Sequence, residues 1–203
     1  MSVVNENKLQ YNLHFPTIVS KHRDKEFANK ILPVAQDILD KTNTSDLEYV
    51  STYKNLKASI KLKEYEWIDK KIIGLANQYC EDNKYNTFPW GFETDLFVSR
   101  MKEGDNHGVH DHPRSCLSGV VYLNTGGEKA QIRFRSDRIR EWTGLTAKQN
   151  CVENMREVWY NVQVGDILMW ESWIPHFVPH TRGGIRETLV FNVYPCVNYN
   201  MEE

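Results

Sequence analysis

The stretch HGVHDHPRSCLSG, residues 107–119, holds three of the chain's seven histidines. His110 and His112 are two residues apart, so on an extended strand both imidazoles project from the same face. Two imidazoles on one face can chelate a divalent transition metal. The stretch therefore predicts a metal site that needs a third ligand from elsewhere in the chain.

The third ligand is predicted to be His176, in the stretch GDILMWESWIPHFVPH. It directly follows ESWIP, close to the end of an apolar strand that could run beside the first one in a barrel. His180 is the competing candidate, but Pro179 and the following TRGG indicate a turn there. His176 is therefore preferred.

A second chemical signal comes from the stretch RETLVFNVYP, residues 186–195. Strand alternation separates two faces, one with Leu189, Phe191 and Val193 and the other with Arg186, Thr188, Val190 and Asn192. The first face is a normal packing surface. The second carries the guanidinium of Arg186 and the hydroxyl of Thr188, which together suit a carboxylate held by a bidentate arginine and a hydroxyl donor.

Ser118 and Tyr122 share one face of the run SCLSGVVYL in the same way. Both lie an even number of residues from His110 and His112, so they would point into the same cavity as the histidine pair if the strand stays regular past Pro113. A turn at HPRS would reset this register. Both residues are therefore candidate members of the site, with a role in core packing as the alternative.

The elements that carry these residues follow from the hydrophobic pattern. Apolar residues recur at helical spacing over residues 24–41 and 62–81. Asp24 is the expected N-cap of the first helix, and Pro33 is a point where that helix would kink or divide. Short β-branched and aromatic runs then predict strands near residues 92–101, 116–123, 130–135, 158–162, 167–171 and 187–194.

This order of elements predicts an α+β or mainly β fold, with two helices buttressing a β-sandwich or open barrel. The length of 203 residues favours one domain over residues 1–203. Its helical buttress is expected at about 24–81 and its β core at about 90–195. The polar segment 136–157 is expected to be a long loop or lid.

Composition excludes several function classes. The net charge of −2 gives no general attraction to nucleic acid or to anionic membranes. The N-terminus lacks the pattern of a signal peptide, and no apolar run is long enough to span a membrane, so a soluble cytoplasmic protein is expected. Its four cysteines form no Cys-x-x-Cys pair and are expected to be free thiols.

Taken together, HDHPRSCLSGVVYL, GDILMWESWIPHFVPH and the Arg-x-Thr strand ending in FNVYP resemble the iron(II)/2-oxoglutarate-dependent oxygenases. The resemblance covers about residues 90–195, with the three motifs in the family's order. It implies a double-stranded β-helix, or jelly roll, that holds Fe(II) with 2-oxoglutarate chelating the metal. Carried onto this chain, the metal ligands and catalytic residues would be His110, His112 and His176. The distal carboxylate of 2-oxoglutarate would be bound by Arg186 and Thr188, with Tyr122 or Ser118 as helpers.

One position departs from the commonest pattern of the wider superfamily, which has a carboxylate two residues after the first histidine. This chain has His112 there, and Asp111 should point to the other face of the strand. Asp105 or His107 could substitute if the strand begins earlier, and His107 could instead support the ligands or face the substrate.

The activity implied by the resemblance is hydroxylation of a substrate with O2, coupled to oxidative decarboxylation of 2-oxoglutarate to succinate and CO2. Trp142, Trp170 and Trp173 are candidate pocket walls. Two alternatives stay open: a cupin-like three-histidine metalloenzyme that does not use 2-oxoglutarate, and a non-catalytic jelly-roll binding module. The sequence identifies neither the substrate nor the oligomeric state, and a homodimer is compatible with it.

Overall fold

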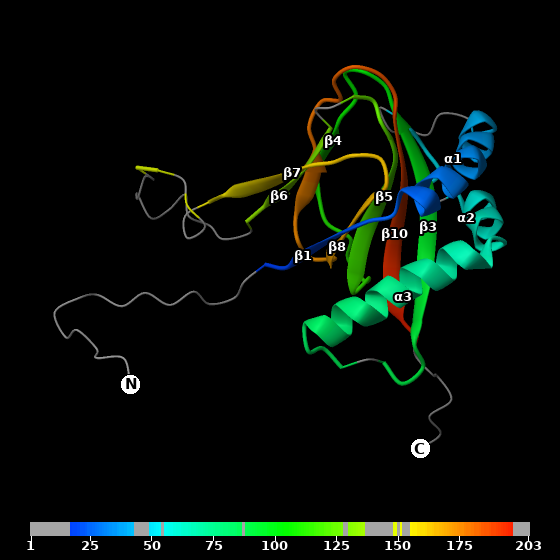
Figure 1. Ribbon diagram of the computed structural model, residues 1–203, viewed down its shortest axis with the longest axis vertical. Coiled ribbons are helices and arrows are strands. Elements are labelled where there is room, and N and C mark those ends of the chain that lie inside the picture. The colour runs from blue at the N-terminus through cyan, green and yellow to red at the C-terminus, as the bar shows by residue number, and fades with distance from the viewer. Residues whose placement is uncertain are drawn as a thin grey trace.

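The computed structural model describes residues 17–42, 49–53, 55–86, 88–127, 130–136, 148–149, 151 and 155–196. Helices α1 to α3 lie together on one side of a body made of strands (Figure 1). The elements are, in chain order, β1 (Val19–Arg23), α1 (Lys25–Asp40), β2 (Val50–Ser51), α2 (Leu56–Lys63), α3 (Glu66–Asp82), β3 (Phe92–Met101), β4 (His107–His110), β5 (Leu117–Thr125), β6 (Gln131–Arg135), β7 (Glu157–Asn161), β8 (Asp166–Glu171), β9 (His176–Val178) and β10 (Arg186–Pro195). None of these helices is long and apolar enough to cross a membrane.

The strands form two antiparallel sheets, as the predicted two-layer β fold requires. The larger sheet has the order β1-β8-β5-β10-β3-β2, and the smaller sheet has the order β4-β9-β6-β7. Strand β10 is central, since it pairs along its whole length with β3 and along most of it with β5. The mainly β architecture with flanking helices is confirmed.

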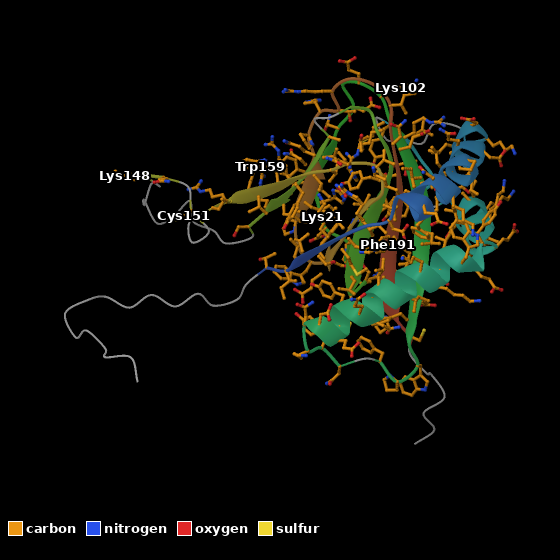
Figure 2. All side chains as sticks on the ribbon, in the orientation of Figure 1. Lys21, Lys102, Lys148, Cys151, Trp159 and Phe191 are labelled. Atoms are coloured by element: carbon orange, nitrogen blue, oxygen red, sulfur yellow. The ribbon has the colours of Figure 1, made fainter. Side chains whose placement is uncertain are left out.

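Each face of the larger sheet buries a different apolar layer. The face toward the helices carries Leu96, Leu189 and Phe191, which pack with buried residues of α1 and α3. Phe191 is labelled in Figure 2. The face toward the smaller sheet carries a second cluster that includes Trp170 and Tyr122. Alternation along the strands therefore separates a packing face from an inner face, and the candidate residues Arg186 and Thr188 lie on the inner one.

The helices differ in part from the prediction. Helix α1 is capped by Asp24, whose carboxylate accepts a hydrogen bond from the amide of Phe27, and it continues through Pro33. The helix predicted over 62–81 is present as α3 but starts at Glu66, and a break separates it from α2, which ends at Lys63 and was not predicted. No glycine or proline marks this break in the sequence.

The predicted strands are all present, with ends shifted by a residue or two, but four further strands were not predicted. These are β1, β2, β4 and β9, which are short or rich in polar residues, so their hydrophobic pattern is weak. Most of the expected lid segment 136–157 lies outside the described residues, and so does Trp142. At its ends, the Ser136 amide donates a hydrogen bond to the Arg156 carbonyl.

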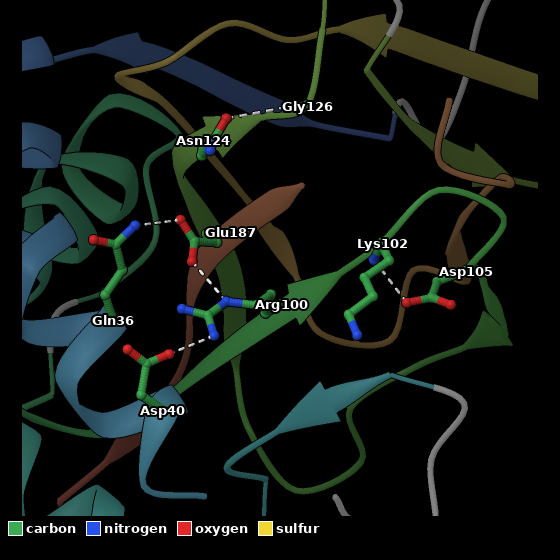
Figure 3. Close-up of polar contacts among 8 residues, drawn as sticks. All are labelled: Gln36, Asp40, Arg100, Lys102, Asp105, Asn124, Gly126 and Glu187. Atoms are coloured by element: carbon green, nitrogen blue, oxygen red, sulfur yellow. Dashed lines mark hydrogen bonds and ion pairs between the residues drawn. The ribbon is translucent and has the colours of Figure 1, made fainter. Parts of the chain in front are cut away.

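Two buried carboxylates hold the edge and centre of the larger sheet. The side chain of Asp166 is fully buried and pairs with Arg23 at 2.6 Å and Lys21 at 2.9 Å, which fastens β1 to β8. Glu187 accepts hydrogen bonds from Arg100 at 2.8 Å and Gln36 at 2.9 Å (Figure 3). Glu187 therefore joins β10 to β3 and α1, at the residue next to Arg186.

Candidate metal centre

Three histidines converge between the sheets, where β4 pairs with β9. His110 lies opposite His176 in this pairing. His112 follows β4, and its backbone amide donates a hydrogen bond to the carbonyl of Ser172 at 3.0 Å. One ring nitrogen from each of the three lies within 4.8 Å of the other two. The structure thus brings together the three residues predicted from the sequence, although the regular strand stops at His110 and does not extend to His112.

Backbone carbonyls orient two of the three rings. Nδ1 of His110 lies 2.8 Å from the carbonyl of Gly108, and Nδ1 of His176 lies 2.9 Å from the carbonyl of Ile174. Because a carbonyl only accepts, each Nδ1 must carry the proton and donate. Nε2 of both rings is then left unprotonated, with a lone pair for a metal.

The histidines are held in the neutral form. Burial, together with the smaller effect of neighbouring imidazoles, lowers the pKa of His112 to about 4 and that of His176 to about 2. Burial also lowers the pKa of His110. Neutral imidazole is the form that binds metal, so at neutral pH no proton has to leave these rings first.

The other candidates for the third ligand lie elsewhere. His107 stacks on His110 with ring centroids 3.8 Å apart, but its Nδ1 lies 3.1 Å from the hydroxyl of Tyr49. His180 is exposed and contacts the carbonyl of Gly104 at 2.8 Å. The carboxylate of Asp105 accepts a hydrogen bond from the backbone amide of Lys102 (Figure 3), and Asp111 is exposed. In the described residues, the cluster of three ligands includes neither carboxylate.

Arg186 is a buried cation that faces the same pocket. The residue is only 5% exposed, and no described carboxylate lies within ion-pair distance of its guanidinium. One terminal nitrogen donates to the hydroxyl of Tyr122 at 3.3 Å, while Nε is buried without a described partner. A buried charge normally requires a partner, so this guanidinium fits an anion in the pocket.

The remaining predicted residues occupy different positions. Thr188 lines the pocket and exchanges a hydrogen bond with Ser99 at 2.8 Å. Tyr122 is fully buried beneath Arg186, with its ring 5.2 Å from the guanidinium carbon. Ser118 is also fully buried, and its hydroxyl contacts Ser172 and Asn192 rather than lining the histidine pocket.

The register assumed for Ser118 required a regular strand past Pro113, and this assumption is wrong. A turn at Pro113 and Arg114, the latter at a φ of 83°, separates His112 from β5. Ser118 nevertheless lies near the histidines through hydroxyl contacts. The hydroxyl of Ser115 donates to the carbonyl of His112 at 3.0 Å and lies 2.8 Å from the hydroxyl of Ser172, which in turn contacts Ser118.

Some lining residues were not identified from the sequence. Phe97, Ser99 and Met101 come from the inner face of β3, and Tyr49 precedes β2. Their alternation along β3 is visible in the sequence, but the direction of that face depends on pairing with β10. Of the predicted tryptophans, Trp170 lines the pocket with its indole N–H buried and unpartnered among the described residues, while Trp173 is 51% exposed.

The arrangement therefore combines two binding functions. Three neutral imidazoles offer a nitrogen donor set that suits a divalent transition metal. A guanidinium with an unused donor lies in the same pocket and suits a carboxylate. The pocket can thus hold a metal together with an anionic ligand.

Comparison with known proteins agrees with this geometry. Residues 95–192 match the model of a family described as "Putative 2OG-Fe(II) oxygenase". No curated protein matches the sequence of this chain. The matched segment contains the histidine pair, the third histidine and Arg186.

Solved structures with a similar fold are distant in sequence. A prolyl-4-hydroxylase from Pseudomonas putida is 14% identical, with a TM-score of 0.60 over 89% of this chain and 94% of that chain. HygX from Streptomyces hygroscopicus, solved with nickel and 2-oxoglutarate bound, is 11% identical, with a TM-score of 0.59 over 88% of this chain and 83% of that chain. The epimerase SnoN from nogalamycin biosynthesis is 12% identical, with a TM-score of 0.58 over 88% and 78%. These likenesses show the double-stranded β-helix fold.

Proposed function

We propose that this chain is a 2-oxoglutarate-dependent hydroxylase of the 2OG-Fe(II) oxygenase family, whose model matches residues 95–192. The family uses 2-oxoglutarate and O2 as cosubstrates. The observation that carries the assignment of residues is the buried guanidinium of Arg186, unpaired with any described carboxylate, in the same pocket as the three histidines. A metal site alone would not require this cation.

In this proposal His110, His112 and His176 hold Fe(II) through one ring nitrogen each. The carbonyls of Gly108 and Ile174 keep two of the rings in the tautomer that leaves Nε2 free. All three ligands are neutral, so the site keeps the full charge of the metal until an anion binds. This favours a dianionic cosubstrate over a neutral one.

Arg186 binds the distal carboxylate of 2-oxoglutarate, and Thr188 is placed to add a hydroxyl donor. Tyr122 lies against the guanidinium, and its burial keeps the pKa of its hydroxyl above the ordinary value. The hydroxyl can therefore support the guanidinium without competing for it as an anion. Ser118 acts at a distance, through Ser172, on the segment that carries His112.

When bound, Fe(II) and 2-oxoglutarate would activate O2, one oxygen atom of which would enter succinate as 2-oxoglutarate loses CO2 while the other would form the hydroxyl group of the product. The chain's own contribution is binding, orientation and exclusion of water. Val120, Ile132 and Trp170 line the pocket with apolar surface beside the histidines. Apolar walls of this kind strengthen the electrostatic interactions inside the site.

The helices belong to the same proposed domain, residues 1–203, because they share one hydrophobic cluster with the larger sheet. Cys80, Cys116 and Cys196 are free thiols, which is compatible with a reducing compartment such as the cytoplasm. Among the alternatives, a three-histidine metalloenzyme without 2-oxoglutarate would leave Arg186 buried and uncompensated. A non-catalytic binding module would need neither the aligned histidines nor the arginine.

The test is turnover of 2-oxoglutarate by the purified protein with Fe(II) and O2. Succinate should form even without the substrate, through uncoupled turnover, and His176→Ala should abolish both Fe(II) binding and succinate formation. His180→Ala is the matched control, since this exposed histidine lies outside the cluster and its loss should change neither. If the wild-type protein binds Fe(II) but forms no succinate, the alternative without 2-oxoglutarate is supported instead.

A further inference from the structure

A groove of about 310 Å³ lies next to the candidate metal centre and is separate from the pocket of Arg186. We propose that this groove binds the primary substrate and that Asp95 selects a substrate carrying a cationic amine. The inference rests on the proposed function, since it names the substrate class of the same site. A volume of this size lies at the lower end for small-molecule pockets.

The groove and the histidine pocket are adjacent and share two lining residues. His112 and Phe97 line both the groove and the histidine pocket. On β3, Asp95 faces the groove, while Ser99 and Met101 face the pocket beyond Phe97. A molecule in the groove therefore lies against His112, and the arginine end stays free for 2-oxoglutarate.

The positions of the two ends follow from strand pairing. Arg186 lies opposite Met101, and Asn192 lies opposite Asp95. Six residues of extended strand separate the pairs, which corresponds to roughly 20 Å. One end of the inner face thus carries a buried cation and the other carries a carboxylate. The histidines lie beside the stretch between them.

Asp95 is the one acidic side chain among the residues that line the groove, and no lysine or arginine lines it. Its described contact is a hydrogen bond from the hydroxyl of Ser59 at 3.1 Å, and no described cation forms an ion pair with it. Asp95 is half-buried, so its charge is only partly screened by water. The groove is therefore complementary to a cation.

Aromatic rings complete the cation site. The rings of Tyr53 and Phe97 lie 5.2 Å apart at an angle of 54°, and Tyr194 lines the same groove. Asn192 accepts a hydrogen bond from Ser118 at 2.8 Å and forms a second side-chain hydrogen bond with Tyr194. Ring faces attract ammonium groups and accommodate the methylene groups beside them. An alkylamine would thus place its nitrogen at Asp95 and its carbon chain toward His112.

The test uses butylamine as the minimal probe, with butan-1-ol and butyrate as neutral and anionic isosteres. Binding is measured by ligand-observed NMR on the protein loaded with Ni(II) and 2-oxoglutarate. We expect butylammonium to bind about tenfold more tightly than butan-1-ol, and butyrate to bind least, as a partly screened ion pair predicts. Equal binding of the three probes would overturn the proposal.

Asp95→Asn should remove the preference for butylammonium, while Glu103→Gln, which neutralises an exposed acid in the turn after β3, should keep it. Tyr53→Leu should weaken butylammonium binding by about twofold to fivefold, the contribution expected from one ring. Retained preference in Asp95→Asn would assign the cation to another site and would refute the role of this residue.

Failure of this inference can be separated from failure of the proposed function. Uncoupled formation of succinate is measured on the wild type and on Glu103→Gln, whose residue lines neither the groove nor the pocket of Arg186, and the two should match. Normal succinate formation without any amine preference would refute the substrate class alone. Amine preference without succinate formation would uphold the groove and refute the oxygenase assignment.

Discussion

Replacing Arg186 by methionine should stabilise the ligand-free protein and abolish binding of 2-oxoglutarate. The guanidinium is 5% exposed and leaves Nε without a described partner, and a buried unsatisfied donor costs about 1 to 3 kcal/mol. A methionine would instead pack beside Met101 and Val178, which already form a small apolar cluster. Taking about 2 kcal/mol, and about 3 °C per kcal/mol for a chain of this length, the Tm should rise by about 6 °C.

The loss of binding follows from the same side chain. A carboxylate held by two charge-assisted hydrogen bonds gains about 3 to 4 kcal/mol, so Kd for 2-oxoglutarate should rise by between about a hundredfold and a thousandfold. Both quantities can be measured on the Ni(II)-loaded protein, by thermal unfolding with and without 2-oxoglutarate and by calorimetric titration. Arg182→Met is the control, because this arginine is exposed. A variant that is less stable yet binds 2-oxoglutarate normally would refute the reasoning.

Three further predictions concern the metal, the sheet edge and the packing. His112→Ala should weaken Ni(II) binding by at least about 100-fold and His107→Ala by less than about tenfold, because His112 belongs to the three-histidine cluster and His107 does not. Equal losses of affinity in a calorimetric titration would contradict this. Burial opposes the ionisation of Asp166, but hydrogen bonds from Arg23 and Lys21 bring its pKa below the ordinary value. The stability that this carboxylate contributes to the folded protein is therefore present above about pH 4 and is lost as the pH falls through the folded pKa. Asp166→Asn should therefore lower the free energy of unfolding by about 2 kcal/mol at pH 7 and by less toward pH 3, as urea titrations would show; a loss that does not depend on pH would contradict it. Gly119→Ala should destabilise the folded protein by about 2 to 3 kcal/mol, because the new Cβ would lie 2.2 Å from the ring of Phe191. Gly74→Ala on the open face of α3 should instead stabilise it by about 0.5 to 1 kcal/mol. Urea unfolding of both variants would show whether the two effects have opposite signs.

The parts of the site that were predicted from the sequence depend on short-range rules. Strand β3 has the predicted bounds, and Arg186 and Thr188 share the pocket face of β10, because alternation of side chains needs only the local chain. His110, His112 and His176 were placed together by their types and by motif order. Their roles as ligands stay a prediction until metal binding is measured.

The parts that were missed depend on contacts between distant segments. Strand β1 reads VSKHR and lacks an apolar pattern, but it is fastened by Asp166, 143 residues from Arg23. Strand β4 is four residues long and irregular, and it pairs with the three-residue β9. The groove at Asp95 likewise needs β3, β10 and the start of α2 to meet. No local pattern in the sequence records such pairings.

The carbonyls that fix the rings of His110 and His176 have a consequence for divergence. Each carbonyl belongs to the residue two positions before its histidine, Gly108 in one case and Ile174 in the other. A backbone oxygen is present whatever side chain the residue bears, so substitutions at these positions leave the acceptor in place. The orientation of both rings therefore depends on two short segments of backbone. The side chains around them can change in evolution while each ring keeps the tautomer that leaves Nε2 free.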